Sequence, residues 1–191
     1  YEAGLITYMR TDSVTISNEA KSSIVQKIES KYGEDYVNLR DYKNKNKSAQ
    51  EAHEAVRPTD INIEEITSDY DQQRLYHLIW KRTISSQMSD AQIERTVVNI
   101  KSDSYNEFFV ARGEVIKFDG FLRVYNEGTD DEIEEEKGVL PALSINENLN
   151  LLSISSRESF SRSPSRFTEA SLVKKLEELG IGRPATYATT I

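Results

Sequence analysis

The spacing of apolar residues changes near Thr96, and this change constrains the fold more than any other feature. Before Thr96, apolar residues recur at helical spacing. After it, short β-branched and aromatic runs are separated by Asp, Asn, Gly and charged residues, which is typical of antiparallel strands. A last segment returns to helical spacing. We therefore predict an α+β fold, with an α-rich domain over 1–94, a β-rich antiparallel domain over 95–160 and a helical segment over 161–191.

Two helices are predicted early in the chain. Residues 14–33 carry Ile or Ala at every fourth position, with Ser17 as the N-cap and Gly33 as the stop. The segment SAQEAHEAVRP, 48–58, indicates a short helix that ends before Pro58, because a residue that precedes proline is disfavoured in the helical conformation. Between these helices, the polar and basic residues 40–50 predict an exposed loop.

Two further helices are predicted by the same reasoning. For the helix over 71–88, we expect an apolar face of Leu75, Leu78, Ile79 and Ile84, with Tyr76 and Trp80 on its flanks. The last helix has Thr168 as N-cap and ends at Gly180. Gly182 and Pro184 then predict a tight turn.

The β-rich part is predicted to contain several short strands. They are TVVNI (96–100), EFFVARG (107–113), EVIKF (114–118), GFLRVY (120–125) and LNLLSI (149–154). The serine- and arginine-rich stretch 153–165 is interpreted as a hinge.

The composition excludes several classes of site. The chain has no cysteine, which excludes disulfides, thiolate nucleophiles and cysteine zinc sites within it. No apolar run approaches the roughly 18 residues of a membrane span, so we expect a soluble, cytoplasmic protein. The net charge of -8 argues against a uniformly basic coat for nucleic acid, but not against a local basic groove. The acidic run 130–136 contributes much of this charge and is interpreted as a solvated loop.

The first candidate site is the pair Tyr8-x-Arg10 in ITYMRTD. A tyrosine hydroxyl is a poor nucleophile unless its developing negative charge is stabilised. An arginine nearby can stabilise that charge and can bind a phosphate bidentately. The pair is thus the minimum set for a phosphotyrosyl intermediate. Taken alone, the spacing is more typical of a half-buried strand tyrosine and a surface arginine that pairs with Asp12, because Y-x-R is a common pattern.

The second candidate is QEAHEAVRP. On a helix, one face would carry Gln50, His53, Glu54 and Arg57. The functional interpretation is that His53 and Arg57 approach a phosphate or its leaving group. The structural interpretation is a solvated polar face.

The third candidate is GIGRPATYA. Its glycines leave backbone amides accessible beside Arg183 and Thr186, as a grip on a phosphate backbone requires. A helix C-cap with an incidental arginine would give the same pattern.

Four stretches, in this order and spacing, together resemble the type IA DNA topoisomerases, and in particular bacterial topoisomerase I. They are GLITYMRTDS, AQEAHEAVRPTD, LYHLIWKRTISSQM and RFTEASLVKKLEELGIGRPATYA. The form YMRTD indicates the topoisomerase I branch, since proline in place of Met9 would indicate the topoisomerase III branch. The resemblance spans nearly the whole chain.

The resemblance implies a function and a set of roles. The tyrosine at Tyr8 would attack a single-stranded DNA phosphodiester, form a 5'-phosphotyrosyl link, let a strand pass and reseal, which relaxes negatively supercoiled DNA. Arg10 would stabilise the scissile phosphate, and His53 would support the same region. The implied DNA-binding residues are Arg57, Arg183, Thr186, Thr11 and Asp12.

The resemblance also implies what lies outside this chain. We expect an internal piece of a longer enzyme, because the chain begins at Tyr1 and the acidic Toprim domain of the family, with its Mg²⁺ site, would precede it. Within the chain we assign no metal. Asp69 and Asp71 form a D-x-D pair, but we interpret them as capping and dipole charges at a helix start. The piece alone is expected to be inactive.

The same resemblance implies that the chain forms part of a toroidal arch. This part would consist of a tyrosine-bearing domain, a hinge domain and a short helical piece of the DNA-binding wall. The implied partners are single-stranded and negatively supercoiled DNA at the bacterial nucleoid, and we expect a monomer. The chain departs from the family pattern at Ser163, Phe167 and Ala185. Ala185 lacks a hydroxyl for phosphate, which favours Arg183 as the contact.

Two alternatives remain open at this stage. The basic faces could serve a non-catalytic module that binds a single strand by its backbone. A tyrosine recombinase or type IB topoisomerase also forms phosphotyrosine, but its arginines and histidine precede the tyrosine, whereas here the tyrosine comes first.

Overall fold

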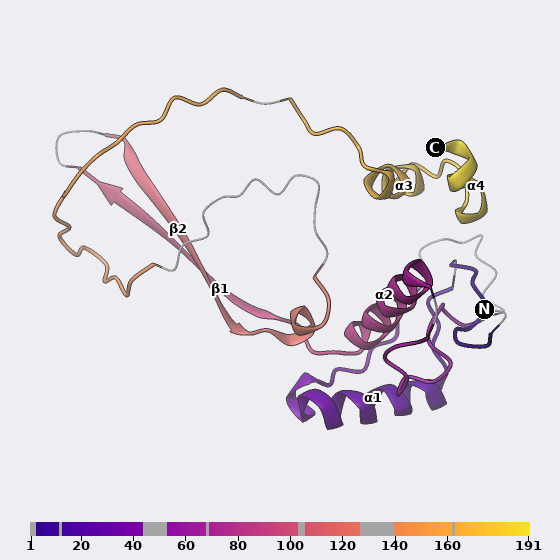
Figure 1. Cartoon of the computed structure of the whole chain (residues 1–191). Coiled ribbons are helices and arrows are strands. Elements are labelled where there is room, and N and C mark those ends of the chain that lie inside the picture. Colours follow the sequence, from indigo (N-terminus) through magenta and orange to yellow (C-terminus); the bar gives the residue numbers. More distant parts are fainter. Residues whose placement is uncertain are drawn as a thin grey trace.

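The computed structural model describes residues 3–11, 13–43, 53–67, 69–102, 106–126, 140–161 and 163–191. Their order is α1 (Asn18–Tyr32), η1 (Glu34–Tyr36), α2 (Tyr70–Ser86), β1 (Gln92–Lys101), β2 (Phe108–Phe118), η2 (Gly120–Arg123), α3 (Glu169–Glu178) and α4 (Pro184–Thr190). Figure 1 shows α1 and α2 in one lobe, with the β1–β2 ribbon extending away from it. Helices and an antiparallel sheet are both present, which confirms the predicted class at this coarse level.

Helix α1 begins and ends where its local sequence predicts. The Ser17 side chain accepts a hydrogen bond from the backbone N–H of Ala20, at 3.3 Å, and Gly33 ends the helix with φ 104°. That positive φ favours glycine because a Cβ is strained there. Ile24 and Ile28 are the buried residues of the helix, as its four-residue spacing predicts.

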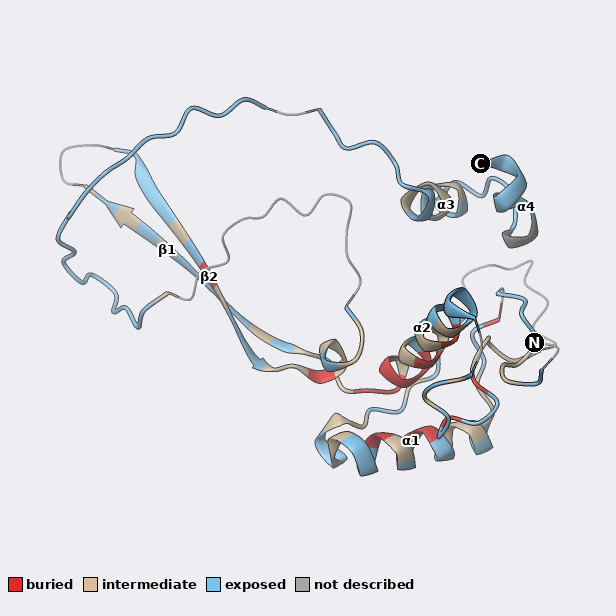
Figure 2. Cartoon of the chain, in the orientation of Figure 1, coloured by how far each residue is buried: buried red, intermediate tan, exposed pale blue. Residues whose placement is uncertain are grey.

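The core lies between α1, α2 and the loop around Ile61 (Figure 2). From α2, the buried rings of Tyr76 and Trp80 pack in this core. The Tyr76 hydroxyl donates a hydrogen bond to Ile63 O at 2.7 Å, and the Trp80 indole N–H donates one to Ile61 O at 2.8 Å. An aromatic ring with a polar end can fill a core while its O–H or N–H satisfies a loop carbonyl.

The predicted face of α2 was therefore wrong in part. Ile84 is buried as expected, but Leu75 and Leu78 are 57% and 51% exposed. Tyr76 and Trp80, placed on the flanks by sequence, occupy the interface instead. Their larger apolar area makes burial of that face more favourable than burial of the leucine face.

The sheet in the described part of the chain is a two-stranded antiparallel ribbon. Strand β1 pairs with β2 from Gln92 opposite Phe118 to Lys101 opposite Phe108, with an irregularity between Gln92 and Ile93. The prediction of several strands was wrong. The predicted strands 107–113 and 114–118 are one strand, β2, which begins at Phe108. The run 120–125 contains the 3₁₀ helix η2 instead of a strand, and 149–154 forms no strand. These runs have strand-like composition, but strand formation also depends on packing against cross-strand partners.

A compact junction joins the ribbon to the helical lobe. The Tyr36 hydroxyl donates to Asp119 Oδ1 at 2.6 Å and accepts from Arg123 at 2.7 Å, and its ring packs on Phe118 with centroids 4.7 Å apart. Close by, the backbone N–H of Phe121 donates to Ser89 O at 2.9 Å. The base of the ribbon is thus fixed to the end of α2.

The C-terminal helix α3 begins and ends where the sequence predicts, but the turn predicted after it is not observed. Thr168 accepts from the N–H of Ser171 at 3.3 Å and starts α3, and Gly180 follows that helix with φ 68°. The predicted tight turn at Gly182 and Pro184 is instead the start of α4, with Pro184 in its first turn. Proline fits there because the first helical N–H groups have no partner within the helix.

Candidate active site

The segment before Tyr8 pairs with the segment that follows His53. Thr7 N–H donates to Arg57 O at 2.9 Å, and Thr59 N–H donates to Leu5 O at 3.0 Å, with an antiparallel bridge between Ile6 and Pro58. Pro58 lacks an N–H, yet it fits because the flanking residues make the hydrogen bonds of this pairing. Residues far apart in the sequence are in this way brought side by side.

The side chain of Thr7 adds two hydrogen bonds to this pairing. Its hydroxyl donates to Ala55 O at 2.7 Å and accepts from the N–H of Arg57 at 2.9 Å. Thr7, the residue directly before Tyr8, is therefore hydrogen-bonded to two points of the loop.

The carboxylate of Glu54 holds the same loop against α1. It accepts from the backbone N–H of Ser17 at 2.7 Å and from the guanidinium of Arg57 at 2.6 Å. Burial acts to raise the pKa of Glu54, but the hydrogen bonds from Ser17 and Arg57 outweigh it, so the pKa of this carboxyl lies below its ordinary value. Ala55 N–H adds a backbone bond to Thr15 O at 2.8 Å.

These contacts bring Tyr8 and His53 together. Their ring centroids lie 5.6 Å apart, with the rings nearly perpendicular at 86°. Tyr8 is 47% exposed, so about half of its side chain is open to solvent. His53 Nδ1 lies 3.0 Å from the carbonyl oxygen of its neighbour Glu54. Because Nδ1 faces a carbonyl oxygen, the N–H at that position is favoured.

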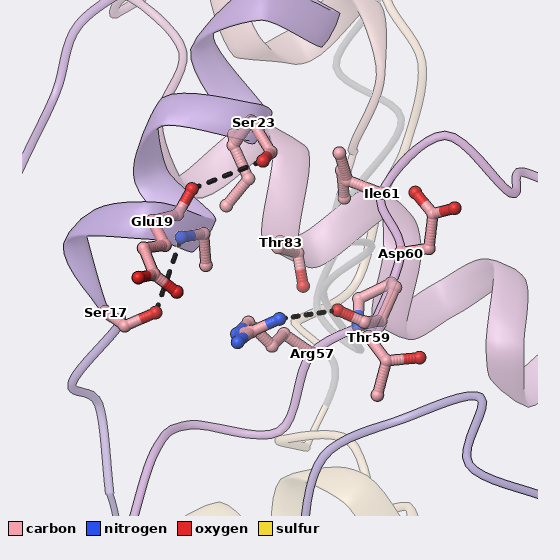
Figure 3. A pocket seen from close by; sticks show the side chains of 11 residues that line it. Ser17, Glu19, Ser23, Arg57, Thr59, Asp60, Ile61 and Thr83 are labelled. Carbon is pink, nitrogen blue, oxygen red and sulfur yellow. Dashed lines mark hydrogen bonds between the residues drawn. The ribbon is translucent and has the colours of Figure 1, made fainter.

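Arg57 lies in a cavity of about 240 Å³ between the start of α1 and residues 59–61 (Figure 3). Its guanidinium is held by Glu54 and by Pro58 O, at 2.9 Å, and its side chain is only 14% exposed. Within the described part of the chain, its buried Nε has no hydrogen-bond partner. This geometry favours a role in organising the loop.

Comparison with known proteins identifies the family. A sequence model described as DNA topoisomerase matches residues 1–191. Curated relatives include DNA topoisomerase 1 of Rickettsia bellii, 50% identical over 98% of this chain and 24% of the relative, and that of Rickettsia conorii, 48% identical over 98% and 25%. The chain belongs to the type IA DNA topoisomerase family.

A solved structure from the same family agrees with this assignment. Full-length topoisomerase I from Thermotoga maritima matches with a TM-score of 0.70 and 32% identity, over 97% of this chain and 29% of that one. The chain thus spans about a quarter of the length of the curated relatives it matches. The family resemblance stated from the sequence is confirmed.

The remaining predicted site residues of this topoisomerase chain fall in two places. Arg10 and Thr11 lie two and three residues after Tyr8 and are exposed, whereas Asp12 lies outside the described residues. Arg183 and Thr186 lie together at the start of α4, where the Thr186 hydroxyl accepts from Arg183 N–H at 2.9 Å and donates to Arg183 O at 3.0 Å. Thr186 therefore shapes the backbone that carries Arg183.

The predicted helix over 48–58 was wrong in its described part, because residues 53–57 are not helical. Of the face expected there, Gln50 lies outside the described residues. The backbone N–H groups of Ala55 and Arg57 bond to Thr15 and Thr7 instead of to helical carbonyls. These long-range partners override the helical propensity of the alanines.

Sequence reasoning gave no functional role to Thr7 or Glu54. The only available signal for Thr7 was its place between Ile6 and Tyr8 in an alternating run, which indicates an extended segment. For Glu54, it was the three-residue spacing to Arg57.

Asp69 acts as the predicted cap, since its side chain accepts from Gln72 N–H at 3.0 Å. In the described part of the chain, no group of three or more His, Cys, Asp or Glu residues could hold a metal ion. Of the helices described there, none has the length and apolar content of a membrane span.

Proposed function

We propose that this chain carries the nucleophile of a type IA DNA topoisomerase, with Tyr8 as the nucleophile. The observation that carries the proposal is the contact between the half-exposed Tyr8 ring and the His53 ring, 5.6 Å apart, in a chain of this family. The two residues come from segments that are distant in sequence, and dedicated hydrogen bonds hold them together.

The proposed reaction is a reversible transesterification on single-stranded DNA. Tyr8 Oη loses its proton and bonds to the phosphorus of a phosphodiester, while the bond from phosphorus to the 3' oxygen breaks and that oxygen takes up a proton. The product is a 5'-phosphotyrosyl link. After a strand has passed, the 3' hydroxyl attacks the phosphorus and releases Tyr8. Relaxation of negatively supercoiled DNA follows without net bond loss.

The other site residues have supporting roles in this proposal. Arg10 stabilises charge on the scissile phosphate, as a guanidinium suits a phosphate bidentately. His53 supports the same phosphate region, and Arg57 organises the loop next to it. Thr11, Asp12, Arg183 and Thr186 contribute to the DNA-binding surface, with the guanidinium of Arg183 as the principal contact of its pair.

The rest of the reaction depends on parts of the enzyme beyond this quarter of its length. Magnesium would supply charge neutralisation at the phosphate, but the described residues offer no cluster of ligands for it, so we assign it none here. We propose that residues 1–94 form the tyrosine-bearing domain, 95–160 a hinge domain and 161–191 a piece of the DNA-binding wall of the arch. The protein would act as a monomer on nucleoid DNA in the cytoplasm.

Substitution of the tyrosine tests the proposal. In the full-length protein, Tyr8→Phe should abolish cleavage and relaxation while single-strand binding persists, because the ring remains and only the nucleophilic oxygen is lost. Tyr70→Phe is a matched control, since Tyr70 is another exposed tyrosine, at the start of α2. Retention of relaxation by Tyr8→Phe would contradict the proposal, because the nucleophile would then be a residue other than Tyr8.

A further inference from the structure

We propose that Thr7 is a positioning residue for the nucleophile: its hydroxyl fixes the backbone that carries Tyr8 against the loop that carries His53. This inference rests on the proposed role of Tyr8 and deepens it. It assigns a function to a hydroxyl that touches neither the reacting oxygen nor, on this account, the DNA.

The hydroxyl stands at the last paired position before Tyr8. In a regular antiparallel pair, residues 7 and 57 would exchange two backbone hydrogen bonds. One of these is present, from Thr7 N–H to Arg57 O at 2.9 Å. The Arg57 N–H, however, donates to Thr7 Oγ1 at 2.9 Å. The side chain thus makes the second bond of the pair directly before Tyr8.

The same hydroxyl also reaches one step further along the loop, donating to Ala55 O at 2.7 Å. A hydroxyl can donate and accept at once, and both functions are used here. An isosteric valine would leave the partly buried Arg57 N–H and Ala55 O without these bonds, at the cost of a lost hydrogen bond for each.

The loop from His53 to Arg57 is anchored on two sides. Towards α1, it is held by Glu54 on the Ser17 N–H and by Ala55 N–H on Thr15 O. Towards Tyr8, it is held by the two side-chain bonds of Thr7 and by the backbone bond from Thr7 N–H to Arg57 O. Removing the hydroxyl would leave the backbone bond and the anchor on α1, so the loop would stay folded, but the 5.6 Å contact between the Tyr8 and His53 rings would be held less tightly.

Thr59 provides a matched control within the same pairing. Its hydroxyl donates to Gly4 O at 2.6 Å, at the end of the paired segment away from Tyr8. Thr59→Val therefore removes one threonine hydroxyl bond from the same two segments without touching the end that carries the nucleophile.

The experiment compares Thr7→Val, Thr7→Ser and Thr59→Val in the full-length protein. The readouts are the rate of covalent adduct formation on single-stranded DNA at saturating DNA concentration, the Kd for that DNA, and the urea midpoint of unfolding. We expect Thr7→Val to slow adduct formation roughly 10- to 100-fold, as small misplacements of a nucleophile do, with Kd changed less than threefold. Thr7→Ser, which keeps the hydroxyl, should restore most of the rate, and Thr59→Val should keep the wild-type rate.

Several results would overturn the inference. They are a wild-type rate in Thr7→Val, a loss in Thr7→Ser as large as in Thr7→Val, and an equal loss in Thr59→Val at the same unfolding midpoint. If Thr7→Val does not fold, Thr7→Ser decides: a wild-type rate supports the inference and a 10-fold loss overturns it. If the proposed role of Tyr8 as nucleophile is wrong, the result is different. The wild-type protein would then form no covalent adduct, or would form one that persists in Tyr8→Phe.

Discussion

At the residue scale, Glu54 determines how the loop beside Tyr8 meets α1. Its carboxylate receives hydrogen bonds from Ser17 N–H and from Arg57, and these outweigh burial in setting its pKa below the ordinary value. Only the ionised form accepts both bonds fully, so the attachment depends on pH. A lowered pKa in the folded state means that the contribution to stability is present above the ordinary pKa and is lost as pH falls through the lowered one.

The lowered pKa of Glu54 gives the first prediction. The free energy of unfolding of the wild-type chain should fall as the pH drops below the ordinary pKa of a glutamate, and Glu54→Gln should flatten part of this slope while lowering stability at neutral pH. Urea unfolding at a series of pH values measures both. Glu178→Gln, which removes an exposed ion pair with Lys175, is the control and should leave the slope unchanged. An unaltered acid slope in Glu54→Gln would contradict the assignment.

The second prediction concerns His53, whose ring lies against Tyr8. His53→Gln should reduce the rate of DNA cleavage by the full-length protein on the order of 100-fold, with only a modest loss of DNA binding, because the imidazole supports the reacting phosphate and not the whole strand. The chain's other histidine, His77, stacks on Trp80 in α2 and serves as the control. Equal effects of His53→Gln and His77→Gln on the cleavage rate would show that His53 has no special role.

At the element scale, the sequence correctly predicted those helices whose ends are determined by residues next to them in the sequence. Helix α1 has its cap at Ser17 and its stop at Gly33, both set by adjacent residues. Residues 53–57, in contrast, have helical composition but bond to Thr7, Thr15 and Ser17, which are far away in sequence. The sequence therefore offered Tyr8 and His53 as candidate site residues, and their chemical roles stay predictions. The non-helical backbone that brings the two rings together could not be predicted from the sequence.

The junction between ribbon and helices gives the third prediction. Gly120 has φ 48°, and a Cβ there would lie 2.5 Å from Ser89 O. Gly120→Ala should therefore destabilise the chain by about 2–4 kcal/mol, from backbone strain together with the clash. Gly33→Ala separates the two causes, because Gly33 also has a positive φ but open space around its Cβ position, so about 1 kcal/mol is expected. Urea unfolding that ranks Gly33→Ala as the more damaging variant would contradict this account.

At the scale of the whole molecule, the core belongs to the helical lobe. In the described part of the chain, the buried apolar residues are Ile24, Ile28, Ile61, Tyr76, Trp80, Ile84 and Met88. Many large apolar residues of the ribbon are exposed instead, and Figure 2 colours most of the ribbon as exposed or intermediate. Apolar runs after Thr96 predicted strands, but their composition cannot tell which runs pair, because pairing depends on distant partners. This is why the class was predicted correctly and the number of strands was not.

The fourth prediction concerns the 191-residue chain by itself. It should not relax supercoiled DNA, since it spans about a quarter of the length of its relatives and its described residues offer no metal cluster. Weak single-strand binding that falls with salt is expected, because the contacts are to phosphates. A gel relaxation assay with Mg²⁺ measures the first property and a salt titration the second. Relaxation by the purified chain would refute this expectation.

The most direct test of the central claim is identification of the covalent adduct. The full-length protein is trapped in denaturant during reaction with a single-stranded oligonucleotide, digested, and analysed by mass spectrometry. We predict that the peptide containing ITYMRTD carries the DNA on Tyr8, linked to the 5' phosphate of the break. An adduct on any other residue, or a link to the 3' phosphate, would contradict the account.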